Sequence, residues 1–278
     1  MEDFTIPLPH LTLAARRWHA GSAGKVLALH GWLDNAASFD RLAPLLPEHE
    51  VVALDLAGHG LSGERPPGAF YHFVDAVPDV VEAARSLGWE RFSLLCHSMG
   101  AGIGPMVAAV LPAQVECLVC IEGLGSLTSP PEEAPSLLRR SLAHRLSDDG
   151  PPVYASLDDA VARLVKRGLT REGAECLARR GTRAVEGGLV FAYDPRVRWP
   201  SRARLTEEQV RAFLREVACP VLFVTAPDGL PYNWDDRTTC LRDVRRLTTT
   251  GGGHHLHLDH PELISREVRD FLTKKGRA

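Results

Sequence analysis

The sequence has no long apolar run and no strong excess of charge of either sign. Its longest apolar segments, such as residues 26–29 and 221–224, are far shorter than the roughly 20 residues that a membrane-spanning helix needs. The net charge of −3 at pH 7 leaves no surplus of cations to neutralise phosphates. We therefore expect no membrane association, and no nucleic acid as the main partner.

Signals for export, for disulfides and for cofactors are also missing. Residues 1–20 lack a basic segment followed by an apolar one, so we expect no secretory signal and a cytoplasmic protein. Several of the six cysteines lie in apolar segments, as buried free thiols in a reducing compartment do. Cys117 and Cys120 stand three apart in a predicted strand, so their side chains point to opposite faces and form neither a redox pair nor a zinc site. The G-x-G-x-x-G motif is absent, and we expect no cofactor.

The order of apolar segments predicts an α/β fold. Over 278 residues, 45% of them hydrophobic, the chain can build one large domain or a core domain with an inserted lid. Strand-like segments alternate with helix-like ones, which predicts a mostly parallel sheet covered by helices on both faces. The predicted strands are 11–17, 26–30, 51–55, 91–95, 115–121, 220–225 and 244–249, and the predicted helices are 39–46, 74–87, 101–111 and 261–272.

The middle of the chain differs in composition from both ends. It is rich in Arg, Glu and Pro, lacks a convincing core strand, and contains amphipathic stretches at 134–145, 157–167, 171–179 and 207–216. We interpret 1–123 and 217–278 as the core domain and 124–216 as an inserted helical cap over the active-site edge. The many arginines of the cap would suit an acidic substrate, but solvated helix faces explain such arginines more often.

The pentapeptide Cys96-His97-Ser98-Met99-Gly100 joins a predicted strand to a predicted helix. This layout is typical of a nucleophile elbow, in which a strained turn exposes a serine hydroxyl at the amino end of a helix. The usual pattern is G-x-S-x-G, and Cys96 takes the place of the first glycine. Neighbouring strands crowd this turn, and cysteine is the next tolerable size.

Two other segments carry a family resemblance. Residues 29–35 (Leu-His-Gly-Trp-Leu-Asp-Asn) and 55–62 (Asp-Leu-Ala-Gly-His-Gly-Leu-Ser) resemble the α/β-hydrolases, and more narrowly the serine hydrolase-like proteins related to haloalkane dehalogenases. The resemblance covers roughly residues 10–125 and 215–275. It implies the α/β-hydrolase fold with an inserted helical cap, and a catalytic triad in the chain order serine, acid, histidine.

By this resemblance Ser98 is the nucleophile and His254 its base. The family's histidine follows a glycine and stands seven residues before a proline, which selects His254 ahead of Pro261. The other histidines of this cluster are expected to pack or to lie on the surface: His255, His257 and His260. We expect no metal site in the cluster, because the run has no carboxylate or cysteine ligand in a tight pattern nearby.

The acid of the triad has two candidates. Some family members place it nine residues after the proline that opens a later strand; here that count from Pro220 reaches Gly229, with Asp228 one residue short. Others place it directly after the strand that follows the elbow helix, where this chain has Glu122. We favour Glu122 and keep Asp228 as the alternative.

The resemblance also implies donors for an oxyanion and a substrate pocket. The backbone N–H groups of Trp32 and Met99 occupy the places of the oxyanion hole. Large aromatic side chains that could line the pocket, or equally belong to the core, are Trp32, Trp199, Tyr232 and Trp234. We expect a small-molecule acyl substrate and a monomer or weak homodimer.

The function expected from these residues is a cofactor-independent serine hydrolase that cleaves an ester or related acyl bond. A variant with the same triad would hydrolyse a C–C bond or carry out perhydrolysis. Dehalogenase or epoxide hydrolase chemistry is disfavoured, because those relatives attack with an aspartate at the elbow. A different class, the non-catalytic α/β-hydrolase-fold binding module, would need a broken triad.

Overall fold

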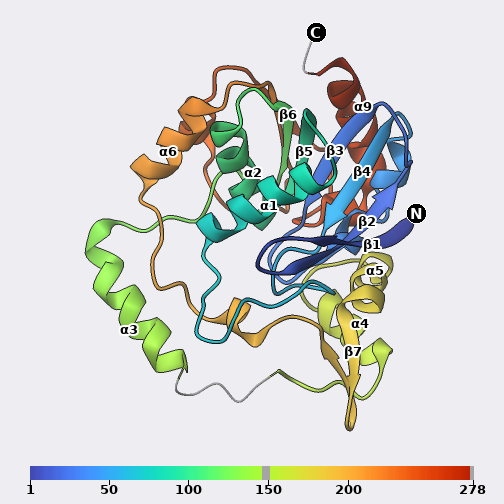
Figure 1. Ribbon diagram of the computed structural model, residues 1–278, viewed down its shortest axis with the longest axis vertical. Coiled ribbons are helices and arrows are strands. Elements are labelled where there is room, and N and C mark those ends of the chain that lie inside the picture. The colour runs from blue at the N-terminus through green and yellow to red at the C-terminus, as the bar shows by residue number, and fades with distance from the viewer. Residues whose placement is uncertain (146–150, 276–278) are drawn as a thin grey trace.

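An eight-stranded sheet forms the centre of the computed structural model, which describes residues 1–145 and 151–275 (Figure 1). Its strand order is β1-β2-β4-β3-β5-β6-β9-β10. The pairs from β4 to β10 are parallel, whereas β1 and β2 add antiparallel at one edge, so the predicted mostly parallel sheet is confirmed. The strands are β1 (Glu2–Pro7), β2 (Thr12–Trp18), β3 (Gly24–Leu29), β4 (His49–Leu54), β5 (Phe92–His97), β6 (Val115–Ile121), β9 (Val221–Thr225) and β10 (Val244–Thr248).

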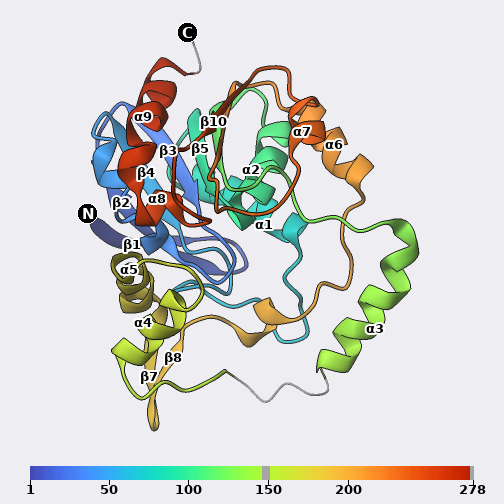
Figure 2. The ribbon, with the colours of Figure 1, turned by 180° about the vertical axis from the view of Figure 1, so that it is seen from behind.

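Helices cover both faces of this sheet. Apolar side chains of α1 (Ala76–Ser86), α2 (Met99–Val110) and α6 (Glu207–Glu216) share one core cluster with the first face. The second face packs against α9 (Ser265–Lys274) and the 3₁₀ turn Ala36–Phe39. Figure 1 shows α1 and α2 in front of the sheet, and Figure 2, the view from behind, shows α9 in front of it. Because buried apolar area drives folding, these two layers are the main stabilising contacts of the molecule.

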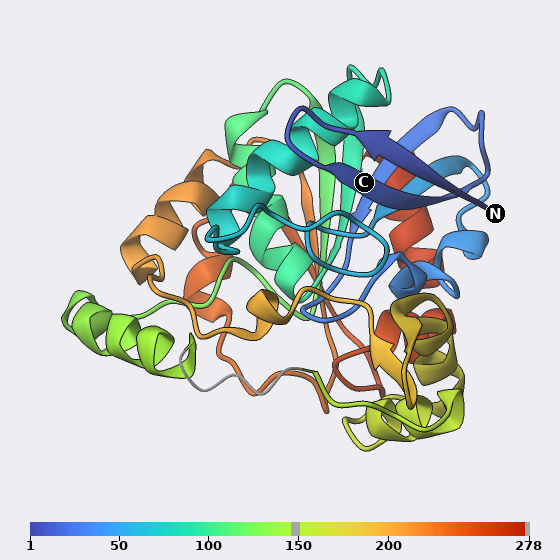
Figure 3. The same cartoon turned by 60° about the horizontal axis from the view of Figure 1, so that its bottom comes forward.

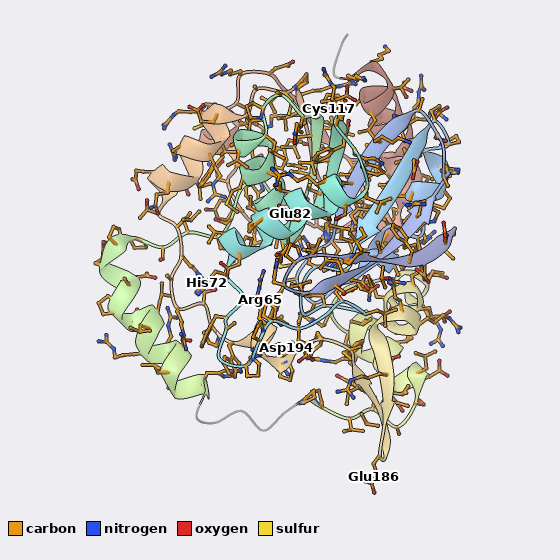
Figure 4. All side chains as sticks on the ribbon, viewed as in Figure 1. Arg65, His72, Glu82, Cys117, Glu186 and Asp194 are labelled. Carbon is orange, nitrogen blue, oxygen red and sulfur yellow. The ribbon has the colours of Figure 1, made fainter. Side chains whose placement is uncertain are left out.

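The cysteines follow the alternation of the strands. Cys96 and Cys120 belong to the core of the first face, and Cys117 to that of the second. All six cysteines are free. In Figure 4 Cys117 lies toward the top of the sheet, away from α4 and the hairpin at the bottom. The opposite facing of Cys117 and Cys120 agrees with the prediction from their spacing.

Two predicted helices differ from those observed. The segment 39–46 forms two short 3₁₀ turns, Ala36–Phe39 and Ala43–Leu45, because Pro44 lacks the N–H that a longer helix would use. The segment 261–272 divides into a 3₁₀ turn, Pro261–Leu263, and α9. Two short helices, α7 (Asp235–Thr238) and α8 (Leu256–Asp259), were not predicted.

The inserted segment lies at one end of the sheet. It contains α3 (Ala134–Arg145), α4 (Leu157–Val165), α5 (Arg171–Gly181) and the hairpin of β7 (Thr182–Val185) and β8 (Gly188–Phe191). Figure 3 shows α3 on one side of this end and α4 with α5 on the other, and Figure 4 shows Glu186 at the tip of the hairpin. Helix α6, which the sequence analysis placed in the cap, packs its buried Val210 and Leu214 into the core beside α2. Among the residues described, no helix is long and apolar enough to cross a membrane.

A buried ion pair links α5 to the core. Asp55, fully buried after β4, accepts hydrogen bonds from the backbone N–H of Ala36 at 2.6 Å and of Leu61 at 2.9 Å. The guanidinium of Arg180 on α5 approaches both oxygens of Asp55, with Nε at 3.2 Å and Nη2 at 3.0 Å. Asp3 accepts a further bond from Arg180 at 2.6 Å. This network fixes α5 against the end of the sheet.

Candidate active site

Ser98 lies on a strained turn between β5 and α2. Its φ of 50° and ψ of −107° are unusual for a residue with a side chain. The turn needs Gly100, because a Cβ there would stand 2.1 Å from the carbonyl oxygen of Leu29. Backbone bonds from Ser98 N to Ile121 O, at 2.9 Å, and from Gly100 N to His30 O, at 3.0 Å, hold it between neighbouring strands.

Cys96 faces away from this turn. A Cβ added to Gly104 on α2 would stand 2.5 Å from the Cys96 sulfur, so the thiol packs between the sheet and the helix. Burial raises the pKa of the Cys96 thiol well above its ordinary value. The thiol is therefore neutral at pH 7 and unsuited to nucleophilic attack.

The structure brings Ser98, His254 and Glu122 together from three parts of the chain. His254 Nε2 lies 2.9 Å from Ser98 Oγ, within hydrogen-bond distance. On the other side of the ring, His254 Nδ1 lies 3.5 Å from Glu122 Oε2. Catalytic hydrogen bonds are often long in an enzyme without its substrate, so this arrangement has the geometry that a triad requires.

Glu122 is buried and held by backbone donors. It directly follows β6, with a φ of 53° and 2% of its surface exposed. The N–H of Ala226 donates to one carboxylate oxygen and that of Leu230 to the other, both at 2.7 Å. These bonds satisfy a carboxylate that would otherwise be costly to bury, and they aim it at His254.

Asp228 does not reach the imidazole. Its side chain is exposed and, among the residues that the structure describes, makes no ion pair or hydrogen bond with His254. The backbone of Asp228 instead forms a bridge with Gly253 and so supports the loop that carries His254. The Glu122 carboxylate fills the space beside the next residue, Gly229, where a Cβ would stand 2.1 Å from its Oε2.

The predicted oxyanion donors belong to two separate segments of the chain. Met99 is the first residue of α2, and Trp32 follows His30 and Gly31 after β3. His30 is a buried turn residue: its Nδ1 lies 2.7 Å from Gly31 O, and its Nε2 accepts from Leu56 N at 3.0 Å. The Trp32 indole donates to Val197 O at 2.9 Å, joining this loop to the segment before α6.

A cavity of about 510 Å³ opens beside Ser98, within the size range of small-molecule sites. Three of the predicted aromatic residues line it, Trp32, Trp199 and Trp234. Tyr232 is not among the lining residues, because its ring packs on Trp234 with centroids 4.4 Å apart and its hydroxyl lies 3.3 Å from Arg237.

One wall of the cavity was not predicted from the sequence. Arg65, Tyr71, His72 and Phe73, from the segment that leads into α1, line it. Figure 4 shows Arg65 and His72 beneath α1 with Asp194 nearby. The Tyr71 hydroxyl donates to Asp194 at 2.6 Å, so this wall is tied to the inserted segment. The cluster of aromatic residues at 70–73, just before a predicted helix, was the available signal.

Next to His254 lies a second polar cluster, around Asp34. His97 Nδ1 is 3.5 Å from Asp34, and His255 Nε2 is 3.3 Å from it. Ser38 donates to Asp34 at 3.2 Å and lies 2.8 Å from His257. The expectation that no carboxylate stands near the histidine run is therefore wrong. Asp34 is distant in sequence, and the fold brings it there.

Charges in this cluster are set by burial and by Asp34. Burial lowers the pKa of His97 to about 4 and lowers that of His257 well below its ordinary value, so both rings are neutral at pH 7. Burial also opposes the charged form of His255, but Asp34 outweighs it and raises the pKa of His255. His260 is less enclosed, with 43% of its side chain exposed and Glu262 at 3.5 Å.

Comparisons with known proteins agree on the fold. Residues 25–261 match a family described as alpha/beta hydrolase fold. A serine hydrolase-like protein of Danio rerio is 33% identical, covering 99% of this chain and 89% of the relative; human serine hydrolase-like protein 2 is 31% identical, covering 98% and 94%. The crystal structure of a hypothetical protein from Pseudomonas aeruginosa PAO1 superposes with a TM-score of 0.91 at 42% identity, and all of both chains are covered.

Proposed function

This chain belongs to the α/β hydrolase fold family, its relatives support a hydrolase, and we propose that it is a serine hydrolase that cleaves an ester or a related acyl bond. The observation that carries the proposal is the 2.9 Å contact between Ser98 Oγ and His254 Nε2 on a strained turn. A serine hydroxyl becomes a useful nucleophile only beside a base that can take its proton.

In the proposed reaction, His254 removes the Ser98 proton as Oγ attacks the substrate carbonyl. Glu122 holds the imidazole orientation and stabilises the imidazolium that forms. The N–H groups of Trp32 and Met99 stabilise the negative oxygen of the tetrahedral intermediate. His254 then returns the proton to the leaving alcohol, and an acyl group remains on Ser98. A water molecule, activated by His254, attacks this acyl group and releases the acid.

The lining of the cavity supports a largely apolar acyl group. Aromatic and aliphatic side chains dominate the walls around Ser98, and they include Leu56, Phe73, Ile103, Leu127, Trp199 and Trp234. Such walls bind hydrocarbon by excluding water, while a few polar groups fix the orientation. Two arginines, Arg198 and Arg204, lie at the exposed part of the lining. A panel of esters with graded acyl length and with neutral or anionic leaving groups would define this preference.

The direct test is labelling and turnover in the variant Ser98→Ala. We expect a fluorophosphonate probe to label the wild-type protein and not the variant. Turnover of p-nitrophenyl esters should fall by a factor on the order of 10⁶ in kcat, as when a triad serine is removed. Ser136→Ala on α3 is the control and should keep both activities. A wild-type protein that is not labelled would instead be a binding module, and unchanged turnover in Ser98→Ala would refute the mechanism.

A further inference from the structure

The cluster around Asp34 has the donor atoms of a transition-metal site. An oxygen of Asp34, Nδ1 of His97 and Nε2 of His255 all lie within 4.8 Å of one another. Two of these separations are 3.5 Å, from Asp34 to His97, and 3.3 Å, from Asp34 to His255. Ligands about 2.0–2.1 Å from a tetrahedral zinc ion stand roughly 3.3 Å apart, so these two edges already fit. The two histidine nitrogens lie no more than 4.8 Å apart.

One donor of the cluster lacks a hydrogen-bond partner. His97 Nε2 lies 2.8 Å from the carbonyl oxygen of His254, which can only accept, so the proton of the neutral ring is on Nε2. Nδ1 then carries a lone pair. It is fully buried, has no hydrogen-bond partner among residues 1–145 and 151–275, and faces the carboxylate of Asp34. A buried lone pair opposite a carboxylate is unfavourable until a cation lies between them.

The backbone beside these two donors leaves space. A Cβ on Gly31 would stand 2.9 Å from His97 Nδ1 and 3.0 Å from Asp34 Oδ2, and glycine keeps that point open. His255 has 16% of its side chain exposed and connects the cluster to solvent. Ser38, which donates to Asp34 at 3.2 Å, holds the carboxylate in place, as partners of metal ligands commonly do.

We propose that Asp34, His97 and His255 bind a divalent transition-metal ion such as Zn²⁺, and that binding lowers the hydrolytic activity at Ser98. Two imidazoles and one carboxylate are a common set of ligands for zinc and leave a fourth position for water. Mg²⁺ and Ca²⁺ prefer oxygen ligands and would bind poorly.

The inhibitory effect follows from where the ligands sit in the chain, and this part rests on the proposed function. His97 directly precedes Ser98, and His255 directly follows His254. His97 also donates to the His254 carbonyl at 2.8 Å. Coordination of one ion by both His97 and His255 therefore shifts their neighbours Ser98 and His254, which make the 2.9 Å contact. A displacement of about 1 Å in a catalytic group can cost on the order of 100-fold in rate.

Zinc binding is measured by calorimetry with ZnCl₂ on protein from which a chelator has removed any metal. The protein carries Ser98→Ala, so the binding measurement does not depend on hydrolytic activity. We expect one ion per chain, with affinity at least 100-fold weaker in Asp34→Asn and in His255→Gln. His260→Gln is the matched control on the same loop and should bind as the parent does. Cobalt should give the absorption bands of a tetrahedral ion. Absence of stoichiometric binding, or equal binding in His255→Gln, which keeps His254 and Glu122, would overturn the site.

The effect on activity is measured in the otherwise wild-type protein, as the ester hydrolysis rate with and without zinc. Each variant is compared with its own metal-free rate. We expect zinc to lower the rate of the wild-type protein at least tenfold and that of His255→Gln by less than twofold. Stoichiometric binding without a change in rate would overturn the inhibitory part. If the metal-free wild-type protein hydrolyses no ester at all, the proposed function is contradicted, whereas the calorimetric test of the metal site still stands.

Discussion

At the scale of single residues, the position of Glu122 favours it over Asp228 as the acid of the proposed triad. Its carboxylate is 3.5 Å from His254 and receives two backbone N–H bonds, whereas Asp228 is exposed. We expect Glu122→Gln to lower kcat by several orders of magnitude, because the amide can no longer stabilise the imidazolium. Asp228→Asn is the matched control and should lower it less than threefold. Steady-state kinetics on a p-nitrophenyl ester measures both, and a reversed order would make Asp228 the acid.

Residue-level predictions succeeded where the signal was local. The elbow around Ser98 could be read from five consecutive residues, and the residues around it form a strand and a helix as predicted. The choice between Glu122 and Asp228 depends on which side chain points inward, and spacing along the chain does not contain that information. The same holds for Asp34, which lies 221 residues from His255 and joins it only in the folded chain.

At the scale of elements, the inserted segment is tied to the core by α5. Arg180 and Asp55 are both almost fully buried, and Asp55 has no other cation at comparable distance in the described part of the chain. We expect Arg180→Met to lower the free energy of unfolding by about 3 kcal/mol, because it leaves a buried carboxylate without its counter-ion.

Arg179→Met, on the exposed side of the same helix, is the control and should change the free energy of unfolding by less than about 0.5 kcal/mol. Urea denaturation of the two variants measures the difference. Equal stability of the two variants would mean that α5 is held by its apolar contacts alone.

Element boundaries were predicted best where strong local signals occur. The helices α3 and α6 match the predicted 134–145 and 207–216, and α6 begins at a capping box formed by Thr206 and Gln209. The edge strand β1 and the hairpin of β7 and β8 were missed. Strand β1 is mostly exposed and gives no apolar run, and each strand of the hairpin has only four residues. The packing of α6 on the core could not be predicted, because an amphipathic face does not reveal which partner covers it.

At the scale of the whole molecule, buried neutral histidines make stability depend on pH. Burial lowers the pKa of His59 to about 3 and also lowers that of His30. Below its ordinary pKa near 6.5, each of these groups binds a proton in the unfolded chain but not in the folded one. Stability should therefore fall as the pH decreases from 6.5 toward 4, by up to about 1.4 kcal/mol per pH unit for each histidine.

The variant His59→Gln isolates one such group. Its free energy of unfolding, measured in urea at pH 7, 6 and 5, should depend on pH less steeply than that of the wild-type protein, by up to about 1.4 kcal/mol per unit. The sign is the test, since replacing a histidine whose pKa rises on folding would make the loss of stability toward acid pH steeper, not shallower. Parallel curves for variant and wild type would show that His59 takes up no extra proton on unfolding.

The contact between Glu122 and Gly229 has a consequence for comparing relatives. A side chain at 229 would occupy the space of the Glu122 carboxylate, so a chain can supply this negative charge from either of two neighbouring strands but not from both. During divergence the charge can keep its place in space while its place in the sequence changes. Aligned columns would then record the loss of an invariant acid where the chemistry had been retained. A histidine that appears to lack its acid should therefore prompt a search of the adjacent strand end.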